Sequence, residues 1–163
     1  MANRPLQLIS RQEDCFSLSR SAARGSALFQ DMLENSPLDE PIVLPNINTE
    51  VLAIVVEYLN YYAKSTASPT PIQKPVRCSN FAELVSEWEY SVVDKQTYVV
   101  FSLITAAGYL GISGLRDLAA AKIAVMISGK TAEEMRHILG IVTDLTPEEI
   151  EAVEQENKWA DDL

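Results

Sequence analysis

The sequence DKQTYVVFSLITAAGYLGISGLRDLAAAKIAVMISG, residues 94–129, predicts two long helices in the middle of a hydrophobic core. Its first half, residues 94–111, is apolar almost all round, which is typical of a helix that is buried on every side. Its second half, residues 112–129, continues as another helix that ends at Gly129, a natural left-handed C-cap. The glycines of GYLGISG follow no predicted strand, so they indicate a corner between helices rather than a phosphate-binding loop.

Upstream of this pair the pattern changes to short strands and amphipathic helices. Residues 6–10 and 15–19 alternate in polarity and predict a β-hairpin, although the RQED turn between them lacks the usual glycine. The further elements expected here are a helix over 26–35 capped by Ser26, a short strand over 42–45 and a helix over 46–62. Residues 64–80 hold three of the eight prolines and no acid, which predicts a loop or a disordered insert.

Downstream, two helix starts carry strong local signals. Thr131 is followed three residues later by Glu134, which is the spacing of a capping box, and Gly140 closes that helix. The last helix begins with Thr146 and Pro147 and has Glu149 at the partner position of a second capping box. Strands and helices therefore come first and helices alone come last, which predicts an α+β domain with a helical C-terminal extension.

Composition narrows the class of function. Of the 163 residues 47% are hydrophobic, enough for a packed core, and the net charge is −10, which argues against nucleic acid and anionic membranes as partners. Residues 146–163 contribute −6 of that charge, with seven acids against one lysine. No signal peptide and no membrane-spanning run is visible, and Cys15 and Cys78 belong to no CxxC pair. We expect buried free thiols and a cytoplasmic and nuclear protein.

The residues that carry catalysis are scarce. His137 is the single histidine, and it lies in a helix where Glu133 and Glu134 can pair with it at the surface. The sequence contains no nucleotide-binding, hydrolase or metalloprotease motif, and no spacing of metal ligands. We therefore expect neither an enzyme nor a cofactor nor a metal site.

Apolar residues near the C-terminus exceed what a short connector and an acidic helix need. Ile150 and Val153 form a thin stripe, and Trp159 stands in an acidic tail. The connector between the last two helices carries Leu139, Ile141, Val142 and Leu145. Either it folds back on its own domain, or a partner supplies the missing half of a core; spacing alone leaves both open.

Three segments together, residues 43–62, 105–141 and 144–163, resemble the Skp family of adaptors. These adaptors join F-box proteins to a cullin in SCF-type ubiquitin ligases. The most diagnostic pieces are Leu44-Pro45-Asn46, the step from Ala106-Ala107 to Tyr109-Leu110, Gly129-Lys130-Thr131 with Glu133-Glu134, and Glu156-Asn157 with Trp159. The resemblance implies a BTB/POZ-like domain with a small three-stranded sheet over 1–128, and an F-box-binding extension over 129–163.

The resemblance also implies two protein-binding surfaces. A cullin would meet the segment that contains Gly108 and Tyr109. F-box helices would interlock with the last helices, with Val99 to Ile104 beneath. The residues expected on the F-box side are Val99, Phe101, Leu103, Leu139, Ile141, Val142, Leu145, Ile150, Val153, Asn157 and Trp159. Without an F-box, the uncovered helices could pair two copies of the chain in a homodimer.

The chain departs from the family pattern at several positions. Gly108 stands where the family usually has asparagine, Ala132 where many relatives have proline, and the loop over 64–80 is basic instead of acidic. The loss of a polar side chain at Gly108 makes cullin binding less secure than F-box binding. A repurposed scaffold in a complex outside ubiquitin transfer, for example in chromosome segregation or transcription, is the alternative function. An elongin C-like adaptor fits less well, because that group largely lacks the terminal helices.

Overall fold

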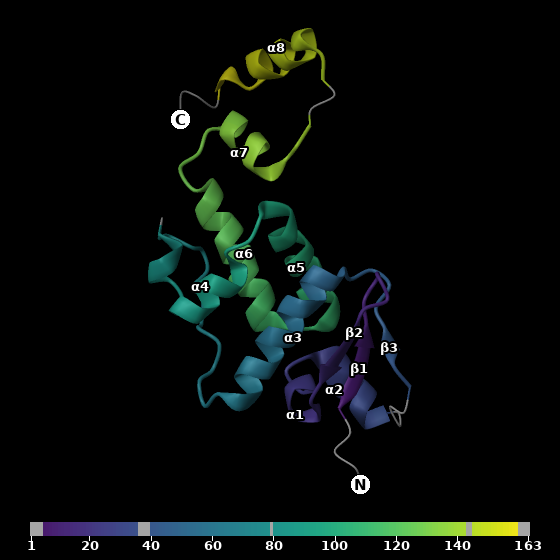
Figure 1. Cartoon of the computed structure of the whole chain (residues 1–163). Coiled ribbons are helices and arrows are strands. Elements are labelled where there is room, and N and C mark those ends of the chain that lie inside the picture. The colour runs from purple at the N-terminus through teal and green to yellow at the C-terminus, as the bar shows by residue number, and fades with distance from the viewer. Residues whose placement is uncertain (1–4, 36–39, 79, 143–144, 160–163) are drawn as a thin grey trace. The chain divides into compact units, whose positions relative to one another are not determined.

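The computed structural model describes residues 5–35, 40–78, 80–142 and 145–159 (Figure 1). The chain divides into two compact units, Met1–Gly129 and Lys130–Leu163. The first unit combines a small sheet with helices, and the second consists of helices within the residues described. The predicted α+β class and the small three-stranded sheet are confirmed.

The sheet is built from the predicted hairpin and one further strand. β1 (Leu6–Ile9) pairs antiparallel with β2 (Cys15–Leu18), with Leu8 opposite Phe16, and parallel with β3 (Ile42–Val43), which gives the order β2-β1-β3. The turn needs no glycine because Glu13 itself adopts a left-handed φ of 67°. That conformation strains a residue with a side chain by roughly 1 kcal/mol.

The hairpin turn also caps the helix α3 (Thr49–Lys64). This helix begins after Asn48, whose side chain makes no capping bond within the described part of the chain. Gln12 of the turn supplies it instead, since its Oε1 accepts from the backbone N–H of Thr49 at 2.9 Å. The hairpin turn and the start of α3 are thereby fixed to each other.

The core of the first unit forms around the two helices predicted from residues 94–129. α5 (Thr97–Leu110) and α6 (Ser113–Ile127) pack against each other, and α3 packs on α5 and on β2 (Figure 1). The largest side chains that are wholly buried include Phe29, Leu52, Leu103, Leu110, Leu115 and Leu118. Burying each such side chain contributes roughly 1.5–3 kcal/mol, so this unit has a substantial core of its own.

The corner between α5 and α6 needs its glycine. Gly111 has a φ of 68°, and a Cβ built on it would lie 2.7 Å from Cβ of Ala27, the first residue of α2 (Ala27–Asn35). The neighbouring Ser26 caps α2 as predicted, accepting from the N–H of Phe29, and donates to the carbonyl of Leu110. The start of α2 is thus held against the end of α5.

Some expectations were wrong or incomplete. α5 is not buried on every side, because Tyr98 is 60% exposed and Tyr109 is 64% exposed. Cys15 is an exposed free thiol and Cys78 is half-buried, so the expectation of buried thiols fails. The sequence reading also missed the one-turn helix α1 (Arg20–Ala23), the 3₁₀ turn Phe81–Glu83 and α4 (Glu87–Val93).

Candidate protein-binding surfaces

One candidate surface is the outward side of α5, which we call the α5 face. It consists of Tyr98, Phe101, Thr105, Gly108 and Tyr109, all exposed. Each of them lies three or four residues from another member, with both Gly108 and Tyr109 following Thr105, which places them along one side of the helix, opposite the buried Val99, Leu103 and Ala107. Large aromatic side chains held in water on a rigid helix are typical of a protein-binding surface.

A groove of about 390 Å³ lies beside the end of this face. Its walls come from the hairpin turn, the loop before α3 with the first turn of α3, and α5: Arg11, Asn46, Ile47, Asn48, Val51, Ser102, Thr105, Ala106 and Tyr109. The backbone N–H of Arg11 donates to the carbonyl of Ile47 at 2.9 Å, which joins two of the walls. One guanidinium, two amides and a phenol can bind a polar protein segment, but they include no nucleophile paired with a base.

Gly108 contributes no side chain to the α5 face. A Cβ built on it would meet nothing within 4 Å, so the glycine is not required by packing. Tyr109 next to it is 64% exposed and lines the groove. The structure thus brings the two residues predicted for cullin binding to an open surface, while their binding role stays a prediction.

The second candidate surface belongs to the Lys130–Leu163 unit. α7 (Ala132–Leu139) and α8 (Pro147–Glu156) both begin with the predicted capping boxes. In α7 the N–H of Glu134 donates to Thr131 Oγ1 at 3.2 Å, and the N–H of Thr131 donates back to Glu134 Oε2 at 2.8 Å. These bonds from Thr131 lower the pKa of the Glu134 carboxyl, and the matching bonds from Thr146 lower that of Glu149. Gly140 ends α7 with a φ of 65°.

These well-capped helices have no core of their own. Among the described residues 130–142 and 145–159 not one is buried. Instead the unit exposes its large apolar side chains: Ile141 at 56%, Val142 at 92%, Leu145 at 47%, Val153 at 47% and Trp159 at 65%. So much uncovered apolar surface on a unit without buried residues indicates a surface that a partner covers.

The residues predicted for F-box binding fall into separate places. Phe101 lies on the α5 face, whereas Val99 and Leu103 are buried in the first unit at 1% and 0% exposure. Ile141, Val142, Leu145, Val153 and Trp159 are exposed in the second unit, and Leu139 and Ile150 are half-exposed. Asn157 closes α8, since its side-chain amide donates to the carbonyl of Val153 at 2.9 Å. Direct contact with a partner is open to the exposed members and not to Val99 or Leu103.

Sequence reasoning missed part of the α5 face and of the groove beside it. Tyr98 and Thr105 of the α5 face were not singled out, although their spacing to Phe101 and Tyr109 was visible in the sequence. Arg11, Asn46 and Asn48 of the groove carry no local signal, because tertiary structure alone brings them together. The described residues contain no group of His, Cys, Asp or Glu suited to hold a metal ion. Nor is any described helix long and apolar enough to cross a membrane.

Fold and surfaces together define a POZ-like protein-binding module with a helical extension. Residues 5–64 match the Skp1 family tetramerisation domain, and residues 113–160 match the Skp1 family dimerisation domain. The chain belongs to the Skp1 family.

Curated relatives match over nearly the whole chain. It is 37% identical over 161 residues to SKP1-like protein 9 of Arabidopsis thaliana, covering 98% of this chain and 99% of that protein. It is 34% identical to the S-phase kinase-associated protein 1 homolog of Tetrahymena thermophila, covering 96% and 94%. It is 32% identical to Suppressor of kinetochore protein 1 of Schizosaccharomyces pombe, covering 96% and 98%.

Proposed function

We propose that this Skp1-family chain is the adaptor subunit of an SCF-type cullin-RING ubiquitin ligase. It bridges F-box substrate receptors, bound by the Lys130–Leu163 unit, to a cullin scaffold, bound by the end of the α5 face that carries Gly108 and Tyr109. The observation that carries the proposal is the absence of any buried residue in α7, α8 and their described flanks, beside five strongly exposed apolar side chains. Membership of the Skp1 family supports the same function.

The mechanism on the F-box side is completion of a core across two chains. Helices of an F-box would bury the apolar side chains around the connector together with Trp159, which has the largest apolar surface among them. An interface tryptophan in such a setting is a frequent hot spot, and its truncation costs roughly 2 kcal/mol or more. The acidic side chains of α8 would speed association with a basic partner.

Capture of F-box proteins tests this half of the proposal. Trp159→Ala should weaken binding by roughly 30-fold or more while the Met1–Gly129 unit stays folded. Gln155→Ala, an exposed polar change in α8 four residues before Trp159, is the matched control and should bind like the wild type. Equal binding by the tryptophan variant and the control would contradict the proposed interface.

On the cullin side, Tyr109 and the groove beside it form the contact. Tyr109→Lys should abolish cullin recovery without loss of F-box binding. Gly108→Asn restores the residue usual in the family at a position where a Cβ meets nothing within 4 Å, so it should fold normally and raise cullin affinity. Unchanged cullin affinity in both variants would show that the α5 face is not the cullin contact.

The alternative is a scaffold that binds F-box-like partners in a complex outside ubiquitin transfer. The bare surface at Gly108 favours it, since the expected polar contact with a cullin is missing. The name of the fission yeast relative, Suppressor of kinetochore protein 1, points to chromosome segregation as one setting. Robust cullin recovery that Tyr109→Lys abolishes would dispose of this alternative.

The proposed role is non-catalytic and needs no cofactor. The composition of the two surfaces supports this, because their described residues pair no nucleophile with a base. Neither nucleic acid nor a membrane is a proposed partner, given the net charge of −10. We place the chain in the cytoplasm and nucleus, and expect the uncovered second unit to support a homodimer when no F-box is bound.

A further inference from the structure

The segment between α3 and α4 has unusual sequence and few attachments. Residues 65–78, all described, form no helix or strand, and they contain Ser68-Pro69-Thr70-Pro71. Two hydroxyl residues, each followed by proline, thus stand two positions apart. A residue before proline is confined to extended backbone, which is the conformation that protein kinases bind in their substrates.

Thr70 is the main attachment of this segment, and its partner is a buried carboxylate. The N–H of Thr70 donates to Glu89 Oε1 at 2.9 Å, and Thr70 Oγ1 donates to Glu89 Oε2 at 2.6 Å. Glu89 lies in α4 and is only 2% exposed. Thr70 itself is half-exposed, so it stands at the boundary between solvent and this buried acid.

Glu89 is ionised and keeps other partners besides Thr70. Burial by itself would raise the pKa of its carboxyl, but hydrogen bonds from Thr70 and Ser86 outweigh burial and lower it to about 2. Ser86 donates to Oε2 through its N–H at 2.9 Å and its hydroxyl at 2.7 Å, and the Tyr62 hydroxyl donates to Oε1 at 2.8 Å. The carboxylate can therefore lose Thr70 and still cap α4.

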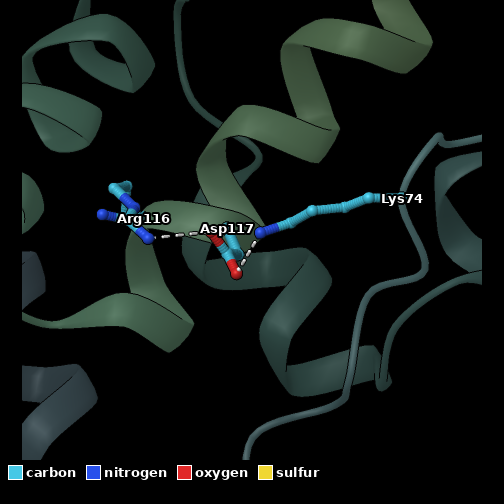
Figure 2. Close-up of polar contacts among 3 residues, drawn as sticks. All are labelled: Lys74, Arg116 and Asp117. Atoms are coloured by element: carbon cyan, nitrogen blue, oxygen red, sulfur yellow. Dashed lines mark hydrogen bonds and ion pairs between the residues drawn. The ribbon is translucent and has the colours of Figure 1, made fainter.

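The second attachment lies at the surface. Lys74 Nζ contacts Asp117 Oδ2 of α6 at 2.8 Å, and Arg116 approaches the other oxygen of the same carboxylate at 3.5 Å (Figure 2). The Lys74 side chain is 65% exposed, and an exposed ion pair of this kind contributes about 0–1 kcal/mol. It cannot hold the segment in place once the Thr70 contact is lost.

We propose that Thr70 is a phosphorylation site for a proline-directed serine/threonine kinase, and that phosphate on Thr70 releases residues 65–78 from α4. In the transfer, Thr70 Oγ1 forms a bond to the γ-phosphorus of ATP. The bond from that phosphorus to the β,γ-bridging oxygen breaks and ADP leaves. The hydroxyl proton passes to a carboxylate base of the kinase.

The consequence follows from charge. Phosphorylation removes the proton that Thr70 Oγ1 donates to Glu89 and puts up to two negative charges beside an ionised, buried carboxylate. Ser68 provides a built-in contrast, because it is exposed and no bond of the Glu89 cluster involves it. Phosphate on Ser68 should leave the attachment intact.

Release would uncover part of α6. A Cβ built on Gly114 would lie 3.1 Å from Cβ of Pro69 and 2.7 Å from the Tyr58 hydroxyl, so Pro69 packs directly against the start of α6. When Thr70 leaves Glu89, Pro69 loses its neighbouring anchor and this surface opens.

The test is phosphorylation of the full chain by a purified proline-directed kinase with ATP, followed by site assignment by mass spectrometry and hydrogen exchange. Four chains are compared: the wild type, Ser68→Ala, Thr70→Val and Ser68→Ala with Thr70→Val. Phosphate is expected on Thr70 in Ser68→Ala, with exchange over 65–78 faster by roughly tenfold, the effect of losing a charge-assisted hydrogen bond. Exchange in α5 should not change, which shows that the fold is intact.

Thr70→Val separates loss of the hydroxyl from the added charge. The unphosphorylated valine variant should exchange more slowly over 65–78 than the phosphorylated Ser68→Ala chain, and its phosphate on Ser68 should add no further increase. Absence of phosphate on Thr70 in the Ser68→Ala chain would overturn the site. A phosphorylated Thr70 with unchanged exchange over 65–78 would overturn the release.

Discussion

The two units use the same local devices to start their helices, yet they differ in what holds those helices in place. α4 of the first unit begins with a Ser86–Glu89 capping box, just as α7 begins with Thr131 and Glu134. In α4 the box acid is 2% exposed and the helix packs on α6, whereas no described residue of α7 is buried. We infer that good ends alone do not stabilise α7, because most of the stability of a helix in a protein comes from the packing of a buried face.

The largest expected contrast is between a core and a surface truncation. Leu103→Ala removes a side chain that is 0% exposed and should lower the free energy of unfolding by roughly 2–5 kcal/mol. Trp159→Ala removes a larger side chain that is 65% exposed and should change it by less than about 0.5 kcal/mol. Urea denaturation of both variants measures the contrast. A loss of several kcal/mol for the tryptophan variant would mean that the second unit has a core in the free chain.

The pH dependence of stability should come from the first unit. The pKa of Glu89 is about 2 in the folded chain against an ordinary 4.5, so its stabilisation is complete above about pH 4.5 and fades as pH falls towards 2. The full loss is roughly 3 kcal/mol. Glu89→Gln should flatten the dependence in this window, while Glu134→Gln at the exposed box should leave it unchanged. Unfolding curves recorded between pH 2 and 5 distinguish the two, and equal slopes in both variants would contradict the assignment.

Replacing the capping residue Ser86 of α4 or Thr131 of α7 should destabilise the two helices equally, but only the change in α4 should lower the global stability of the chain. Each change to alanine costs its own helix roughly 1 kcal/mol. Ser86→Ala should lower the free energy of global unfolding, because α4 packs on α6. Thr131→Ala should only speed hydrogen exchange in α7. A global loss of similar size in both variants would break the distinction between the units.

The smallest effect is expected within the first unit, at two glycines of one helix end. Gly108→Ala should raise the free energy of unfolding by about 0.5–1 kcal/mol, because glycine is a poor helix residue and the position is open. Gly111→Ala should destabilise, because its φ is 68° and its Cβ would lie 2.7 Å from Ala27. Thermal melting of the two variants shows whether each substitution raises or lowers the stability. Stabilisation by both changes would show that the corner is less constrained than described.

Local chemistry made most elements predictable. The capping boxes at Thr131 and Thr146, the terminators Gly129 and Gly140, and the alternating hairpin all form as expected. The box at Ser86 and Glu89 has the same spacing and was missed, although the sequence contained it. The family and the small three-stranded sheet were also predicted correctly.

Contacts between residues far apart in the chain could not be predicted from the sequence. Gln12 caps α3 from 37 residues away, and no local pattern indicates such a partner. The groove beside Tyr109 draws its walls from three separate segments. The exposure of Tyr98 was misjudged, since an aromatic residue on a binding surface looks like a core residue in a sequence. Which of the predicted F-box residues bind a partner stays a prediction.

Hydrogen exchange of the full chain, with and without an F-box protein, tests the central claim most directly. In the free chain the amides of α7 and α8 should exchange through local opening, far faster than those of α5 and α6. On binding an F-box protein, α7 and α8 should become protected while α5 and α6 stay as they were. Protection of α7 and α8 equal to that of α5 in the free chain, or no change on binding, would contradict an interface that completes the core of the second unit.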